Sequence, residues 1–198
     1  MAEAVLISIR PRWCELIASG KKTIEVRKTI PKINTPFKCY IYCTKDNKAQ
    51  FWIARTYFYL DDHAHNAFDK CGNGAVIGEF MCDEIQRYAR YGQFKEPARY
   101  MKSSPGGYPA TEIHYASLQL SPDALKQYGK GAPLYGLCIS DLVIYDEPKK
   151  LTDFMKPCDP DPDGVPLCFQ CKRLVENYGC GGTILRPPQS WCYVEELK

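Results

Sequence analysis

Short apolar segments of β-type composition are the sequence feature that most limits how this chain can fold. Only a few short helices are expected, and two of them have clear boundary signals. The first begins at Pro11 and stops at Gly20. The second begins at Pro122, directly after the N-cap residue Ser121, and ends by Gly129. Many short strands and few helices predict an α+β protein built on a small mixed β-barrel. The expected strands are Ala4–Ile9, Thr23–Arg27, Phe37–Cys43, Ala75–Cys82, Tyr135–Tyr145 and Ser190–Glu195.

Composition places the chain among globular proteins. Its 198 residues suit one domain, and 45% hydrophobic and 25% charged residues argue against wholesale disorder. No apolar run reaches the roughly 18 residues of a membrane span. Ala4–Ile9 is also too short for the apolar core of a secretory leader. We therefore expect a cytoplasmic protein with reduced thiols and no membrane partner. Residues 83–110 are rich in Tyr, Arg, Gly and Pro and predict a surface loop with a short helix.

Cysteine is unusually frequent, with 11 residues, an odd number that cannot pair completely within one chain. Four of them lie in a C-terminal segment rich in Pro, Gly and Asp, where a Cys-x-x-Cys pair has chelating spacing. A structural Zn²⁺ is expected there, because four thiolates would order a segment that cannot build a core. A redox pair and unliganded thiols are the alternatives. The expected ligands are Cys158, Cys168, Cys171 and Cys180, whereas the cysteines of the apolar strands are expected in the core.

Positive charge is concentrated near the N-terminus. Residues 1–50 hold 10 Lys and Arg against 4 Asp and Glu, whereas the net charge of the whole chain is +3. A local basic surface favours a polyanionic partner such as a nucleic acid, although a solvated basic face is the simpler alternative.

Residues 20–27, with the sequence Gly-Lys-Lys-Thr-Ile-Glu-Val-Arg, combine a turn with a charged strand. Gly20 permits a sharp turn with positive φ. Glu25 and Arg27 share one face of the strand, and Lys22 lies at the turn before it. Such a set could recognise a base edge and a phosphate, or it could catalyse hydrolysis with a lysine of lowered pKa and a glutamate proton carrier. An exposed ladder of ion pairs is the structural alternative.

This segment fits the G-x-K-x-x-E-x-R signature of the ASCH domain, a relative of the PUA domain. The strands at 76–80 and 135–142 and the closing segment at 186–194 are similar to those of phage and prophage members. The resemblance implies a single ASCH (PUA-like) domain over residues 1–198, with insertions at 46–74, 85–118 and 155–182. It further implies a bacterial or phage-infected cell and a barrel that binds RNA or a modified nucleoside.

The resemblance also implies which residues act. Lys22, Glu25 and Arg27 would be catalytic if the protein is an enzyme, and Gly20 would shape the site. Some bacterial members hydrolyse 4-acetylcytidine, using the motif lysine and a threonine two residues before the motif arginine; here Glu25 occupies the threonine position. Other members are ribonucleases. A phage accessory protein that binds a host protein is a third possibility.

Aromatic side chains are the remaining candidates for contact with a nucleobase. Trp13, Tyr40 and Trp191 could stack on a base, although each also fits a hydrophobic core.

Overall fold

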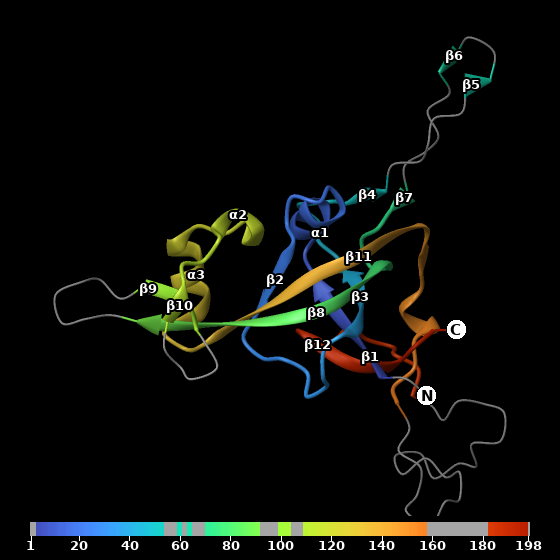
Figure 1. The fold of residues 1–198 in the computed structure, drawn as a ribbon. Helices are drawn as coiled ribbons and strands as arrows, with labels where there is room; N and C mark the ends of the chain where they lie inside the picture. The colour runs from blue at the N-terminus through green and yellow to red at the C-terminus, as the bar shows by residue number, and fades with distance from the viewer. Residues whose placement is uncertain are drawn as a thin grey trace, which may run out of the picture. The chain divides into compact units, whose positions relative to one another are not determined.

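The computed structural model describes residues 3–53, 59–60, 63–64, 70–91, 99–103, 109–157 and 182–197. Within these ranges the chain forms strands of very unequal length and a few short helices (Figure 1). In chain order the elements are β1 (Glu3–Ile9), α1 (Pro11–Ala18), β2 (Ile24–Arg27), β3 (Phe37–Cys43), β4 (Trp52–Ile53), β5 (Tyr59–Leu60), β6 (His63–Ala64), β7 (Lys70–Cys71), β8 (Val76–Tyr91), β9 (Arg99–Ser103), β10 (Pro109–Thr111), α2 (Tyr115–Leu118), α3 (Pro122–Gly129), β11 (Leu134–Lys149), the 3-10 helix η1 (Leu151–Asp153) and β12 (Trp191–Glu195).

The elements with the clearest local signals form as predicted. The helix α3 occupies residues 122–129, and the side chain of its N-cap Ser121 accepts a hydrogen bond from the Ala124 amide. The helix α1 begins at Pro11, and Gly20 follows it with φ of +70°. Strand β3 has the predicted bounds, and the other expected strands form with shifted or extended ends. Capping residues and alternating apolar positions therefore determine these elements locally.

The main sheet is mixed, and it is open rather than closed into the predicted barrel. Its strand order is β10-β9-β8-β3-β1-β12, with β11 beside β8 and β2 beside β11. Strand β1 is parallel to β3 and antiparallel to β12. Among the described residues the terminal strands β10 and β12 pair with no further strand, so the hydrogen-bonded path does not close. The expectation of a closed barrel is therefore wrong, because local periodicity carries no information on how the two ends of a sheet meet.

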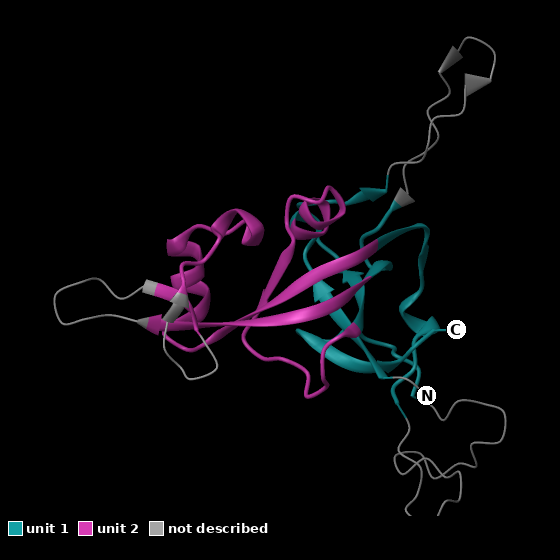
Figure 2. Cartoon of the chain, viewed as in Figure 1, with its two compact units in different colours: residues 1–12, 38–79, 143–198 teal, residues 13–37, 80–142 magenta. Residues whose placement is uncertain are grey.

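The described chain divides into two compact units (Figure 2). Unit 1 comprises residues 1–12, 38–79 and 143–198, and unit 2 comprises residues 13–37 and 80–142. The two 16-residue strands β8 and β11 each contribute residues to both units. Unit 2 contains the whole charged motif of residues 20–27.

Unit 1 has a core of aliphatic and aromatic side chains from β1, β3 and the C-terminal region. The Tyr40 ring is edge-on to Phe154, with 4.9 Å between ring centroids. The Tyr40 hydroxyl accepts a hydrogen bond from the Leu197 amide at 2.9 Å, which anchors the end of the chain. The buried members of this core are Ala4, Leu6, Tyr40, Tyr42, Val76, Phe154, Ile184 and Val194.

Unit 2 has a separate core, and this core explains why β8 extends far beyond its predicted end. Tyr88 on β8 and Tyr100 on β9 are 1% and 4% exposed. Their burial stabilises a strand where local composition predicted a loop. A Cβ at Gly136 would lie 2.5 Å from the Tyr88 hydroxyl, so only glycine admits this close approach. The core consists of Ile24, Val26, Tyr88, Tyr100, Ile113, Leu118, Leu125 and Leu134.

The predicted zinc ligands Cys158, Cys168, Cys171 and Cys180 lie outside the described residues. In the part of the chain that is described, the cysteines are free thiols, and no group of three or more His, Cys, Asp and Glu side chains is arranged to hold a metal ion. None of the helices in that part is long and apolar enough to cross a membrane.

Candidate nucleic-acid site around Lys22, Glu25 and Arg27

Backbone hydrogen bonds from three directions hold the turn that precedes β2. The Lys22 amide donates to the Leu16 carbonyl of α1 at 2.9 Å. The Thr23 amide donates to the Ser117 carbonyl of α2 at 3.0 Å, and the Thr23 carbonyl accepts from the Ile139 amide of β11 at 2.9 Å. The turn is therefore hydrogen-bonded to two helices and one strand, which constrains the backbone of Lys22.

The ammonium group of Lys22 is buried and fully hydrogen-bonded. Its Nζ donates to the Ile24 carbonyl at 2.8 Å and to the Leu118 carbonyl at 2.7 Å, and it lies 3.4 Å from Glu25 Oε2. These three acceptors match the three donors of an ammonium group. The side chain of Lys22 is 2% exposed, and its Nζ also lies 5.2 Å from the centroid of the Trp13 ring.

Glu25 lies between two cations on one face of β2. While Oε2 faces Lys22, Oε1 lies 3.1 Å from Nη2 of Arg27. The side chain of Glu25 is 6% exposed and that of Arg27 is 13% exposed. One carboxylate and two cations give the cluster a net positive charge, and Arg27 is its outermost member. The predicted alternative of an exposed ion-pair ladder is wrong, because two of the three side chains are buried.

Opposing effects act on the protonation of Lys22. Burial lowers the pKa of Lys22 below its ordinary value, because an ammonium group loses hydration in the interior. The Glu25 carboxylate raises this pKa through its charge and hydrogen bond, and the Arg27 guanidinium lowers it. The net direction is downward. This direction is the one that a lysine general base needs, whereas the three acceptors around Nζ stabilise the charged form.

The structure brings together most of the residues that the sequence suggested for this site. Gly20, Trp13, Lys22, Glu25 and Arg27 all belong to unit 2, and direct contacts link the last four. Tyr40, which the sequence suggested as a base-stacking residue, does not belong to this group. It belongs to unit 1 and is fully buried in the core, so its ring offers no surface for base stacking.

Sequence reasoning missed the contribution of α2 and of the residue that follows it. Leu118 supplies a carbonyl acceptor for Lys22 although it lies 96 positions away in the chain. The Gln119 side chain donates to the Lys21 carbonyl at 3.1 Å and to the Ala116 carbonyl at 2.7 Å. All three contacts involve backbone oxygens, which any residue type provides, so the sequence contained no signal for them. Leu118 is the last residue of the segment 85–118, which the family resemblance suggested as an insertion, and Gln119 directly follows it.

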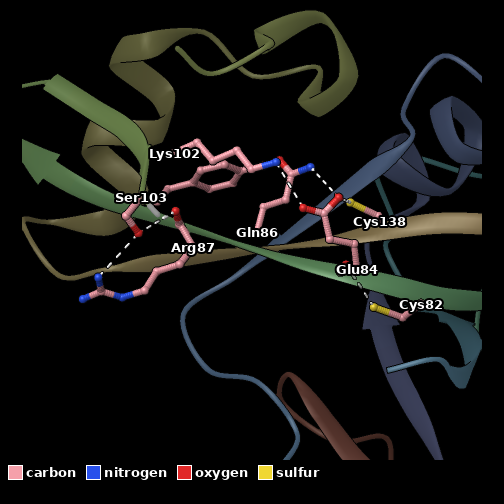
Figure 3. Close-up of polar contacts among 8 residues, drawn as sticks. Cys82, Glu84, Gln86, Arg87, Lys102, Ser103 and Cys138 are labelled. Carbon is pink, nitrogen blue, oxygen red and sulfur yellow. Dashed lines mark hydrogen bonds and ion pairs between the residues drawn. The ribbon is translucent and has the colours of Figure 1, made fainter. Parts of the chain in front are cut away.

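A second polar cluster surrounds Glu84 on β8 in unit 2, and Figure 3 shows its side chains converging from three strands. The carboxylate of Glu84 lies 3.1 Å from Lys102 Nζ of β9 and accepts from the Cys138 thiol of β11 at 3.8 Å. Burial raises the pKa of Cys138 to about 11 and that of Cys82 to about 12. Both cysteines are therefore neutral thiols at physiological pH and poor nucleophiles. The cluster links neighbouring strands and has no activated group.

Comparison with known proteins identifies the family. The ASCH domain model matches residues 7–122, more than half of the chain. The crystal structure of ASCH from Zymomonas mobilis has a TM-score of 0.50 at 17% identity, with 98% of this chain and 88% of that chain covered. Two single-residue variants of that protein each give 0.49 at 17% identity, covering 98% of this chain and 91% and 89% of theirs. No curated protein sequence matches. The structural likeness shows the fold, and the family match over residues 7–122 shows that this chain belongs to the ASCH domain family.

Proposed function

We propose that this protein binds RNA at the site formed by Lys22, Glu25 and Arg27. ASCH domains are PUA-like and generally bind RNA, which is the first support for the proposal. The second is electrostatic, because unit 2 has 12 Lys and Arg against 8 Asp and Glu in sequence and so holds the excess of positive charge. The observation that carries the proposal is the arrangement of Glu25, which holds Arg27 at the outer end of a positively charged cluster.

The geometry divides the roles among the three side chains. Lys22 uses all three donors on protein acceptors, so its role is to neutralise and orient Glu25. Glu25 in turn orients the guanidinium of Arg27. A guanidinium presents several donors in a planar fork and can bind a phosphate or a guanine edge with two hydrogen bonds. Arg27 is therefore the group of this cluster that contacts RNA.

Substitution of Arg27 tests the proposal. Because a charge-assisted hydrogen bond contributes about 1.5–3 kcal/mol, Arg27→Gln is expected to weaken binding of a fluorescent single-stranded RNA roughly 10- to 150-fold. Arg27→Lys is expected to recover part of the loss through its charge. Fluorescence anisotropy at several salt concentrations provides the measurement.

The matched control is Lys48→Gln, which removes one positive charge from an exposed side chain of unit 1. It is expected to leave affinity within about twofold, since screened surface charges contribute little. Equal affinities for the wild-type protein and Arg27→Gln, or no binding of RNA by the wild-type protein, would overturn the proposal.

Hydrolysis by the same residues is a second candidate, and the lowered pKa of Lys22 favours it. The substrates to test are an N-acylated cytidine, in which water would cleave the amide to release the acid and cytidine, and single-stranded RNA. Product that forms with the wild-type protein and is lost in folded Lys22→Met would establish catalysis. Binding without product would leave the protein a binder.

A further inference from the structure

Strand β11 lies beside β2 (Figure 1). The register of the two strands places an aromatic residue opposite Arg27. In the antiparallel register Tyr135 pairs directly with Arg27, and Leu137 pairs with Glu25. Residues directly opposite each other in an antiparallel pair point to the same face, with Cβ atoms about 5 Å apart. Tyr135 and Arg27 therefore lie side by side on the face that carries the buried ion pairs.

Burial decreases along these two strands towards Arg27 and Tyr135. The inner pair, Leu137 and Glu25, is buried from solvent, with exposed fractions of 1% and 4%. The outer pair of Tyr135 and Arg27 is only partly buried. The less buried end of the charged cluster thus carries one phenol ring and one guanidinium.

We infer that Tyr135 is a base-stacking platform and that the ligand of the site is an unpaired nucleobase within a single-stranded RNA. This inference rests on the proposed function. An aromatic face binds any nucleobase by stacking, but only when the base is outside a duplex. Arg27 beside it can then donate to the base edge or to the adjoining phosphate.

Lys28, the residue after Arg27, supports a single-stranded RNA rather than a free nucleoside as the ligand. Lys28 is exposed, and its Nζ lies 5.0 Å from the ring centroid of Tyr128, an exposed residue of α3. Because Lys28 directly follows Arg27 in the chain, its exposed ammonium group suits another phosphate of the same RNA molecule.

The experiment compares Tyr135 variants with a single-stranded RNA that carries one 2-aminopurine and with a hairpin duplex of the same composition. Because stacking contributes about 1–3 kcal/mol per base, Tyr135→Leu is expected to weaken binding of the single strand roughly 5- to 150-fold. Tyr135→Phe keeps the ring and is expected to stay within about twofold. Quenching of 2-aminopurine on binding is expected for the wild-type protein and Tyr135→Phe, and its loss is expected for Tyr135→Leu.

Lys28→Gln is the second arm. It is expected to lower the salt dependence of single-strand binding by about 0.7 in the log–log slope and to leave mononucleoside affinity unchanged. A thermal melt of each variant shows whether it is folded. Leucine is chosen at position 135 because an apolar side chain preserves packing there.

The outcomes separate the inference from the proposed function. Undiminished affinity and quenching in Tyr135→Leu, together with a large loss in Arg27→Gln, would overturn the stacking role and leave RNA binding in place. Tighter binding of the hairpin than of the single strand would also overturn it. No binding of either RNA by the wild-type protein would overturn both.

Discussion

At the scale of single residues, the charged cluster owes its properties to burial. A carboxylate that loses water needs partners, and Glu25 has one cation on each oxygen. Lys22 needs acceptors for the same reason and finds two of them on the backbone. The three side chains consequently depend on one another, so substitution of one changes the environment of the others.

This dependence predicts non-additive stability. Lys22→Met is expected to lower the free energy of unfolding by about 3 kcal/mol, because the substitution leaves Glu25 buried with one cation fewer. Lys22→Met combined with Glu25→Leu is expected to cost less than the sum of the single variants by at least about 1 kcal/mol. Guanidinium-induced unfolding monitored by circular dichroism measures both values.

The control for this cycle is Lys48→Met, at an exposed position, which is expected to change stability by less than about 0.5 kcal/mol. Strict additivity of the two core variants would show that Lys22 and Glu25 do not interact energetically.

At the scale of elements, the strands with alternating apolar residues and the capped helices formed as the sequence predicted, whereas residues 83–110 did not. That segment was expected to be a surface loop with a short helix, and its described parts belong to β8, β9 and β10. Tyr88 pairs with Lys102 across β8 and β9, and the two tyrosines at 88 and 100 pack into the core of unit 2. Strand formation here depends on cross-strand partners, which composition alone does not reveal.

The zinc site predicted for the cysteines between residues 158 and 180 stays a prediction. Purified protein is expected to contain about one equivalent of zinc, since four thiolates complete a tetrahedral site. The double variant Cys168→Ser/Cys171→Ser is expected to lose the metal. Cys71→Ser, at an exposed free thiol, is the matched control and is expected to retain it.

Inductively coupled plasma mass spectrometry provides this measurement. Less than about half an equivalent in gently purified protein would contradict the zinc site. A disulfide between Cys168 and Cys171 in metal-free protein would instead support the redox alternative.

At the scale of the whole molecule, acidic groups that are neutral when buried occur in both units. Tyr145 in unit 1 donates a hydrogen bond to Glu79, and burial together with this bond raises the pKa of Tyr145. Cys82 in unit 2 is fully buried, and its pKa is raised to about 12 from an ordinary value of 9.0. Such groups link the stability of the fold to pH.

The sign of this linkage predicts loss of stability in alkali. A group with a raised pKa in the folded state stabilises it fully below the pKa of the unfolded state, and this stabilisation is lost as pH rises through the folded value. For Cys82 the loss is expected between about pH 9 and about pH 12. Urea unfolding at a series of pH values from neutral upward measures it. Cys82→Ala is expected to show a shallower decline, and identical declines would show that this thiol is not coupled to folding.

The sequence by itself determined the local elements and the shared face of Glu25 and Arg27, because caps, turn glycines and a period of two act within a few residues. The sequence also contains, at residues 20–27, the motif that resembles the signature of the ASCH domain. The tertiary structure alone decided that Lys22 is buried against the Leu118 carbonyl, that Tyr135 stands opposite Arg27, and that the sheet stays open. These features depend on backbone hydrogen bonds and burial between segments about 100 residues apart, and local residue patterns do not specify which distant segments meet.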